Sequence, residues 1–427
     1  MPQALETPVL LRLRECPISA RMTQITAFDI FPIQKFYDFH PDANINYQLN
    51  RALYPGAEQL FATIGQRIKN FDDWKTEFFK AAREHEGLGD IRAAAELYRA
   101  AEFFISASDP DRVVAYEKFF DLFYAADPRA AKARVSIPYG KGRLHGLVFR
   151  SQAPSQGAVV IHAGFDAYIE AFIGLAQFIS NSGFDVVIFD GPGQGTTLMQ
   201  EHIPMTAAWE KPVAAVLNHF SLDDVTLIGV SLGGYLALRA AAFEPRVKRV
   251  MAFDVMLDFF QCITSRRGAL AEFLITSLVK LKASPLLNLL ARMMMKHDLY
   301  SRWGIEQAIH VTGRATPAEA FHDLLKYNTR DISALLTQDV FIMAGAKDHF
   351  VPIKQFHEQL RLLTNARSVT GRIYTRAEQA QSHCQIGSFG LAAREMLTWI
   401  YLHIAADPEA GDLMDEYDDV HSGVANP

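Results

Sequence analysis

The chain has 427 residues, with 42 Lys and Arg against 48 Asp and Glu and a formal net charge of −6. At roughly 150 residues per domain, this length indicates two or three domains, or one large domain with additions. Hydrophobic residues make up 49% and charged residues 21%, which excludes a mainly disordered chain. The lack of a cationic surplus argues against a nucleic-acid-binding protein.

Three cysteines, Cys16, Cys262 and Cys384, are too few and too scattered to predict a disulfide framework or a zinc site. The apolar run near the N-terminus is interrupted by two arginines and lacks the core of a signal peptide. Charged residues and a proline also interrupt residues 269–295, the most apolar later stretch, so we expect no membrane span. We therefore expect a cytoplasmic protein without a bound metal.

Residues 1–133 are predicted to form an N-terminal helical domain or lid. Several prolines and an aromatic cluster predict an irregular chain over residues 1–50. From residue 57 to about residue 126, apolar residues recur at helical spacing, with Asp90 as an expected N-cap. This part of the sequence has no strand signal.

From residue 134 the pattern changes to strands and helices in alternation. Two alternating segments around the turn Gly140-Lys141-Gly142 predict a strand pair. Short apolar strands and helices then follow one another. The predicted strands lie at 157–163, 184–190, 224–230 and 247–254, and the predicted helices at 167–182, 205–220 and 232–243. Buried strands that alternate with helices are typical of a parallel sheet covered on both faces, so the fold class is α/β.

The alternation stops at Asp254 and resumes at about residue 337. Residues 255–336 are predicted to be an inserted helical cap, because they are helical in pattern and rich in Leu, Phe and Met. The core therefore comprises residues 134–254 and 337–405. Its second part has predicted strands at 338–345 and 368–375 and helices from about 353 and from about 384 to 404, and residues 406–427 form an acidic tail that we expect to be mobile.

The motif with the clearest chemistry is Gly229-Val230-Ser231-Leu232-Gly233. It lies between a predicted strand and a predicted helix, which is the context of a nucleophile elbow. The turn presents the Ser231 hydroxyl above the sheet edge, and the N–H of Leu232 at the helix start points towards a developing oxyanion. Ser231 is thus the candidate nucleophile, with a serine in a tight packing turn as the alternative.

A nucleophilic serine needs a base, and the base needs a carboxylate that orients it. After an elbow of this kind the chain order is carboxylate, then histidine. Asp348 follows the strand at 338–345, and His383 precedes the last helix, so they are the candidate acid and base. Asp254 or Asp258 is the alternative acid. Cys384 lacks an elbow and is disfavoured as a nucleophile.

The second oxyanion donor is expected in the loop after the strand at 157–163. Within that loop, the N–H of Phe165 is the first candidate and that of Gly164 the second. Asp166 and Glu170 lie just beyond, either as charges near a helix N-terminus or as substrate contacts. His162 is expected to have a structural role in the loop, and His349 is expected to be solvated.

Two further features bear on the substrate. The segment Asp190-Gly191-Pro192-Gly193-Gln194-Gly195 lacks the spacing of a phosphate-binding loop and is interpreted as a tight turn after a strand. The cap contains Met293, Met294 and Met295 and is expected to cover the nucleophile. A methionine-rich apolar cap fits a bulky apolar substrate.

With these motifs in order, residues 134–405 resemble the α/β-hydrolase superfamily. The segment DIRAAAELYRAAEFFISASDPDRVVAYEKFF and the motifs HAGFDAYIE, DGPGQG, GVSLGG and GAKDHFVP extend the resemblance to residues 55–405 and narrow it to one subgroup. That subgroup contains the polyketide-shortening hydrolases of the yellowish-green pigment type and 2,6-dihydroxypseudooxynicotine hydrolase. Ala163 stands where the subgroup has a first glycine.

The resemblance implies an eight-stranded, mostly parallel sheet flanked by helices, and it supports Ser231, Asp348 and His383 as a catalytic triad. It also implies hydrolysis of a carbon–carbon bond next to a carbonyl in a polyketide-like or aryl ketone, through an acyl-serine. Such an enzyme of secondary metabolism, for example in pigment biosynthesis, needs no cofactor. It is expected to be a homodimer, and its substrate is free or carried on a carrier protein. The alternatives are an esterase or thioesterase, or an inactive binding protein of this fold.

Overall fold

A computed structural model describes residues 30–405, and the predictions for the chain before and after them lie outside this range. Its centre is an eight-stranded sheet in the order β1-β2-β4-β3-β5-β6-β7-β8. Strands β1 and β2 form an antiparallel hairpin, β2 pairs antiparallel with β4, and all other pairs are parallel. The strands are β1 Arg134–Tyr139, β2 Gly142–Phe149, β3 Ala158–His162, β4 Asp185–Asp190, β5 Val225–Val230, β6 Val247–Phe253, β7 Asp339–Gly345 and β8 Ser368–Tyr374.

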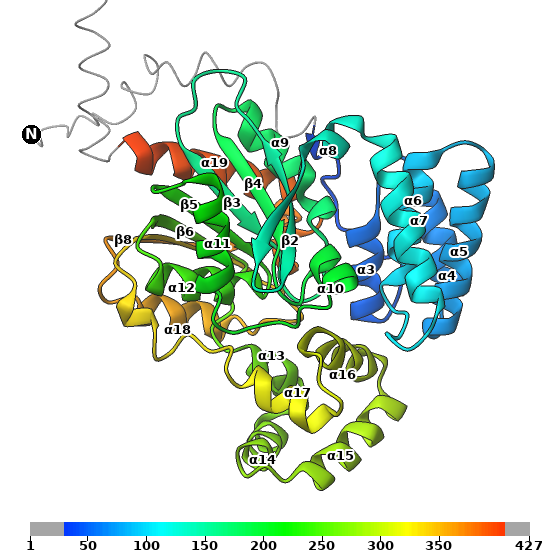
Figure 1. Ribbon diagram of the computed structural model, residues 1–427. Helices are drawn as coiled ribbons and strands as arrows, with labels where there is room; N and C mark the ends of the chain where they lie inside the picture. The colour runs from blue at the N-terminus through cyan, green and yellow to red at the C-terminus, as the bar shows by residue number, and fades with distance from the viewer. Residues whose placement is uncertain (1–29, 406–427) are drawn as a thin grey trace, which may run out of the picture.

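The central strands have the composition that a doubly covered sheet requires. Every residue of β5 and of β7 is buried, and both strands are nearly continuous apolar runs. Helices cover the sheet on both faces (Figure 1). They are α9 Ile173–Asn181, α10 Gly195–Glu201, α11 Glu210–Phe220, α12 Gly233–Phe243, α18 Lys354–Leu362 and α19 Phe389–Ala405. The predicted α/β-hydrolase fold is therefore confirmed.

The N-terminal helices stack together on one side of this core (Figure 1). They are α3 Ala43–Ala52, α4 Glu58–Arg67, α5 Phe71–Gly87, α6 Ile91–Glu102, α7 Asp111–Ala126 and α8 Pro128–Ala133. Helix α3 lies where the sequence predicted irregular chain, so that prediction was wrong for its residues. Its polar side chains serve tertiary contacts: Asn46 Oδ1 accepts hydrogen bonds from the N–H groups of Phe39 and His40 at 2.7 and 3.0 Å.

Five helices follow β6 and precede β7 in the chain, and they lie beyond the sheet (Figure 1). They are α13 Phe259–Thr264, α14 Ala269–Lys280, α15 Ser284–His297, α16 Leu299–Thr312 and α17 Pro317–Leu324. Within residues 30–405, no helix combines the length and the apolar character that crossing a bilayer requires.

Three predicted helices differ from the structure at their ends. The helix expected over 167–182 is a short 3-10 segment, Ile169–Phe172, followed by α9. The helix expected over 205–220 begins only at Glu210. The last helix begins at Phe389 and not near residue 384, because Cys384 and Gln385 have φ values of 48° and 49°, which a right-handed helix does not accept.

Candidate active site

Ser231 occupies a strained turn between β5 and α12. Its φ is 62°, and its N–H donates to the Phe253 carbonyl at 2.7 Å while its own carbonyl accepts from the Gly234 N–H at 2.8 Å. A side chain at Gly229 would overlap the Gly233 carbonyl, so the strand and the helix meet this closely only with glycine there. The predicted strand–turn–helix context is present, and it lifts the Ser231 hydroxyl away from the sheet.

The structure brings Ser231, His383 and Asp348 into one hydrogen-bonded chain. His383 Nε2 lies 2.8 Å from Ser231 Oγ, and His383 Nδ1 lies 2.6 Å from Asp348 Oδ2. Asp348 follows β7, and its other oxygen accepts from the N–H groups of Phe350 and Val351 at 2.7 and 3.0 Å. These bonds fix the carboxylate, which faces Nδ1 of the imidazole and leaves Nε2 facing Ser231 Oγ, the arrangement of a serine triad.

Burial and charge act in opposite directions on this pair. Burial alone would lower the pKa of His383, but the Asp348 carboxylate outweighs it and holds that pKa well above its usual value. Burial would likewise raise the pKa of Asp348, and the facing imidazolium instead lowers it. The Asp348 carboxylate therefore favours the charged imidazolium form of His383.

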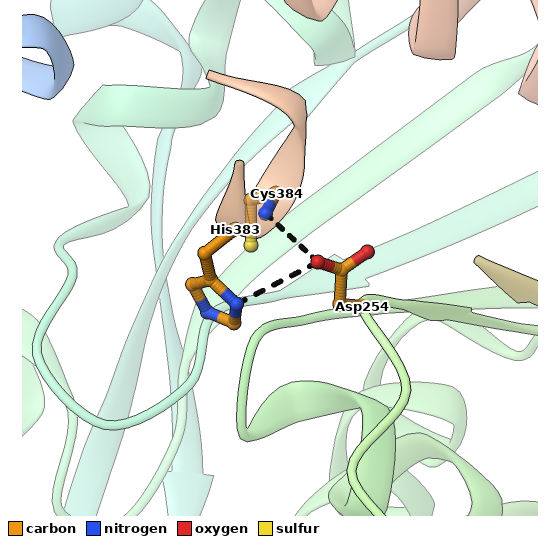
Figure 2. A group of neighbouring side chains, drawn as sticks. All are labelled: Asp254, His383 and Cys384. Atoms are coloured by element: carbon orange, nitrogen blue, oxygen red, sulfur yellow. Dashed lines mark hydrogen bonds and ion pairs between the residues drawn. The ribbon is translucent and has the colours of Figure 1, made fainter. Parts of the chain in front are cut away.

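A second carboxylate, Asp254, lies beside the same imidazole at the end of β6. Its Oδ2 is 3.6 Å from His383 Nδ1 and accepts from the Cys384 N–H at 3.0 Å (Figure 2), and its Oδ1 accepts from Gln385 Nε2 at 2.9 Å. Burial and the nearby Asp348 charge raise the pKa of Asp254 to about 7. Asp254 thus anchors the turn that carries His383, whereas Asp258, the other alternative acid, pairs with Arg330.

The ligand atoms of Asp254, His383 and Cys384 lie within 4.8 Å of one another, so they are the group to consider as a metal site (Figure 2). His383 Nδ1 is already bound to Asp348, and both oxygens of Asp254 accept hydrogen bonds. A cation held by these atoms would compete with the bonds that orient the imidazole. Burial also raises the pKa of the Cys384 thiol, which keeps it from being a reactive thiolate.

The loop after β3 runs directly against the elbow. A Cβ at Gly164 would come within 2.7 Å of the Leu232 nitrogen, so only glycine permits this approach. Among the hydrogen bonds within residues 30–405, the N–H groups of Leu232 and Phe165 have no acceptor. These two predicted oxyanion donors are therefore available; the alternative donor, the Gly164 N–H, likewise has no acceptor among the described residues, so the choice between Phe165 and Gly164 stays a prediction.

Two glutamines keep that loop in place, and the sequence analysis missed both. Gln194 Nε2 donates to the carbonyls of Ala163 and Gly164 at 2.6 and 3.0 Å. Gln307 Nε2, from cap helix α16, donates to the Phe165 carbonyl at 2.9 Å. The carbonyl groups of Ala163, Gly164 and Phe165 thus all accept hydrogen bonds from buried glutamine side chains, which fixes the path of the loop. Gln194 lies in the motif interpreted as a tight turn, and its position next to a glycine-rich strand end was the available signal.

The N-terminal helices also reach the site. Tyr47 of α3 is buried, and its hydroxyl donates to the His383 carbonyl at 3.2 Å. Its ring lies 4.9 Å from that of His349 and 5.4 Å from that of Phe350. His349 is therefore packed against these rings, so the prediction that it is solvated was wrong. Burial lowers the pKa of His349 to about 3. His162 ends strand β3 fully buried, with Nδ1 3.0 Å from the Ala163 carbonyl oxygen, which fits a structural role.

A cavity of about 640 Å³ opens on Ser231 and His383. Its walls come from the N-terminal helices, the loop after β3 and the cap, and they are mostly apolar; Leu53, Phe172, Met256, Phe259, Met294 and Trp303 are among them. Asp166 and Glu170 line the cavity as well. Arg51 pairs with Asp166 at 2.9 Å. The Tyr124 hydroxyl donates to Glu170 Oε1 at 2.6 Å, and Glu170 Oε2 is buried without a hydrogen-bond partner.

Residues 157–371, half of the chain, match the family described as alpha/beta hydrolase fold. The chain belongs to this family. The hydrolase acrC of Aspergillus aculeatus is 26% identical over 420 residues, which cover 85% of this chain and 97% of the relative. The 20-hydroxy-prefusarin hydrolase FUS2 of Gibberella moniliformis is 28% identical over 406 residues, which cover 83% and 95%.

Solved structures support the same α/β-hydrolase assignment. The 2,6-dihydroxy-pseudo-oxynicotine hydrolase has a TM-score of 0.57 at 20% identity, over 83% of this chain and 95% of its own. AbyA5 has a TM-score of 0.64 at 18% identity, over 88% and 97%. At these identities the solved structures establish a shared fold. The fungal hydrolases confirm the resemblance that the motifs predicted.

Proposed function

We propose that this protein is a serine hydrolase that cleaves a carbon–carbon bond next to a carbonyl in a polyketide-like or aryl ketone substrate. The observation that carries the proposal is the hydrogen-bonded chain Ser231–His383–Asp348 at the wall of an apolar cavity. A serine with a base at 2.8 Å and a fixed carboxylate behind it has the geometry of nucleophilic catalysis.

In the proposed reaction, Ser231 Oγ adds to the ketone carbonyl carbon while His383 Nε2 takes the hydroxyl proton. The N–H groups of Leu232 and Phe165 stabilise the resulting oxyanion. Collapse breaks the bond to the neighbouring carbon, whose electron pair leaves as an enolate because the adjacent carbonyl delocalises it. His383 returns the proton to the leaving carbon. Water, activated by the same imidazole, then hydrolyses the acyl-serine and restores the Ser231 hydroxyl.

Two features support a bulky, mainly apolar substrate of this kind. The cavity is walled mainly by aliphatic, aromatic and methionine side chains, which suit a flat or flexible carbon skeleton. The names of the relatives specify a hydrolase of 20-hydroxy-prefusarin and one of 2,6-dihydroxy-pseudo-oxynicotine. Glu170, whose free oxygen has no partner within residues 30–405, and Asp166, held by Arg51, are the proposed polar contacts that orient the substrate.

A fluorophosphonate probe tests the nucleophile without knowledge of the substrate. We expect the native protein to be labelled once, and Ser231→Ala to be unlabelled at an unchanged melting temperature. Ser265→Ala, on the cap side of the molecule, is the matched control and should be labelled like the native protein. Equal labelling of Ser231→Ala and the native protein would refute the assignment.

The bond that is cleaved needs a second experiment. The protein is incubated with an aryl β-diketone and with an aryl ester of matched shape, and the products are identified by mass spectrometry. We expect both halves of the diketone, one as a carboxylic acid and one as a methyl ketone. Hydrolysis of the ester alone would replace the carbon–carbon hydrolase with an esterase that uses the same serine.

A further inference from the structure

Cap helices α14 and α15 carry an apolar surface that no other described part of the chain covers. The two helices pack against each other and, with the turn between them, present seven large apolar side chains that are each about half exposed or more. We call this surface the cap face. It consists of Leu270, Phe273, Leu274, Leu281, Leu286, Leu289 and Met293. Leu281 is 77% exposed and Leu270 72%, so these side chains protrude from the surface and do not line a groove.

The cap face is also basic, in contrast to the chain as a whole. Four exposed cations, Lys280, Lys282, Arg292 and Lys296, lie on or between the same two helices. None of them forms an ion pair with another described residue. Glu272 is the only acid between residues 266 and 297, and Gln261 donates a hydrogen bond to it at 2.7 Å. A local surplus of positive charge thus surrounds the apolar side chains of a protein whose net charge is −6.

At helix α15 the cap is a single helix thick between solvent and the active-site cavity. Met293 is 52% exposed on the cap face, while its neighbour in the chain, Met294, lines the active-site cavity. Ile263 and Tyr300, which flank the two helices in sequence, also line the cavity. Helix α15 therefore carries part of the cap face on its outer side and reaches the cavity through Met294.

We propose that the cap face binds the surface of an anionic lipid membrane, with α14 and α15 lying flat at the interface. Helices of this kind bury their apolar side chains at the headgroup boundary, while their Lys and Arg side chains contact anionic lipids. Protruding Leu and Phe side chains fit a deformable lipid layer, whereas a protein partner would need a matching groove for each. The docked cap would bring the cavity next to an apolar phase, although membrane binding itself does not depend on the proposed catalytic function.

A second copy of the chain fits this surface less well. In a symmetric dimer the same patch faces itself, so the four cations of one copy would face the four cations of the other. Glu272 offers a single opposite charge, and it is already bound to Gln261. Like charges brought together in this way oppose association, whereas an anionic membrane compensates all four cations.

The test uses the full-length protein and two kinds of vesicle, pure phosphatidylcholine and phosphatidylcholine with 30% phosphatidylserine, in a flotation assay. We expect binding to the anionic vesicles that weakens as salt is added. The double variant Lys280→Gln/Lys282→Gln should bind about thirtyfold more weakly, from the contribution of two basic residues near an anionic surface. Phe273→Glu should lose at least about tenfold.

Leu88→Glu is the matched control, because Leu88 is 81% exposed on the N-terminal helices and the substitution makes the same change of charge. It should bind like the native protein, and all variants should keep native fluorophosphonate labelling. The proposal is overturned if the native protein ignores anionic vesicles, or if Leu88→Glu and Phe273→Glu lose binding equally. It is also overturned if light scattering shows a two-chain mass that falls to 47.8 kDa in Phe273→Glu, since the cap face would then hold a second copy.

Discussion

Replacing Asp348 and Asp254 separately by Asn identifies the carboxylate that orients His383. Each change removes a charge beside the imidazole with almost no change in size. Asp348 Oδ2 is 2.6 Å from His383 Nδ1, within hydrogen-bond range, whereas Asp254 Oδ2 is 3.6 Å away and beyond it. We therefore expect Asp348 to orient the base and Asp254 to support the turn behind it.

The two substitutions should differ strongly in magnitude. Asp348→Asn removes the acceptor that keeps the proton on Nδ1, and the loss of this tautomer in a serine triad costs about 10⁴-fold in rate. Asp254→Asn keeps one acceptor oxygen for its two donors, the Cys384 N–H and Gln385 Nε2. It should lose one buried hydrogen bond, about 1–3 kcal/mol in the free energy of unfolding, and less than tenfold in rate.

The pKa of Asp254 gives this comparison a pH dependence. At about 7, that pKa leaves the native carboxyl mostly neutral at pH 6 and mostly ionised at pH 8. Asparagine is neutral at both values. The native protein therefore gains a negative charge near the imidazolium as the pH rises, while Asp254→Asn does not. While His383 is still partly protonated, that charge raises its pKa and lowers the share of free base, so the rate ratio of native protein to Asp254→Asn should be highest at pH 6 and should fall towards pH 8.

The assay is the second-order rate of fluorophosphonate labelling at pH 6 and pH 8, with a thermal melt for each protein. Asp258→Asn is the control, because Asp258 also follows β6 but binds Arg330 and not the imidazole. A loss of 10³-fold or more in Asp254→Asn together with a mild effect of Asp348→Asn would refute the assignment of Asp348 as the orienting acid.

Two of the three other predictions use the same labelling assay, and the third uses urea unfolding. Gly164→Ala should slow labelling by about 10²-fold or more, since its methyl group would press on Leu232 N, whereas Gly304→Ala, with open space around it in the same cavity, should be neutral. Tyr47→Phe should lower the free energy of unfolding by about 1 kcal/mol, measured with urea, because one buried hydrogen bond to the His383 carbonyl is lost. The labelling rate of the native protein should rise with pH as His383 loses its proton, with a midpoint above 6.5, and this midpoint should fall in Asp348→Asn; an unchanged midpoint would contradict the carboxylate as the cause.

The sheet and the candidate triad were predictable because their signals are local. A fully buried parallel strand such as β5 is a continuous apolar run, and the strained turn at Ser231 needs glycines at fixed spacing. Asp348 and His383 each follow a strand, and the carboxyl ends of parallel strands meet at one edge of a sheet. A short sequence pattern therefore predicts residues that lie 152 positions apart and form a hydrogen bond.

The errors have a different origin, because they depend on contacts between distant parts of the chain. Helix α3 has buried polar side chains that its sequence alone does not justify, and two of them, Asn46 and Asn50, bind the extended segment before it. The helix expected from residue 384 starts later because Asp254, from the end of β6, holds the Cys384 N–H and the Gln385 side chain. Neither partner can be recognised from the local pattern.

The same long-range contacts explain why the chain is longer than its sheet requires. The loop with the predicted oxyanion donor is held by Gln194 from the core and by Gln307 from the cap, and the turn that carries His383 is held by Tyr47 from the N-terminal helices. Each added segment thus contributes a buried hydrogen bond to a loop of the candidate site, in addition to a wall of the cavity. A change that moves α3 or α16 should therefore alter the positions of His383 or Phe165 as well as the shape of the cavity. The fit of the substrate is thus coupled to the positions of the proposed reacting groups.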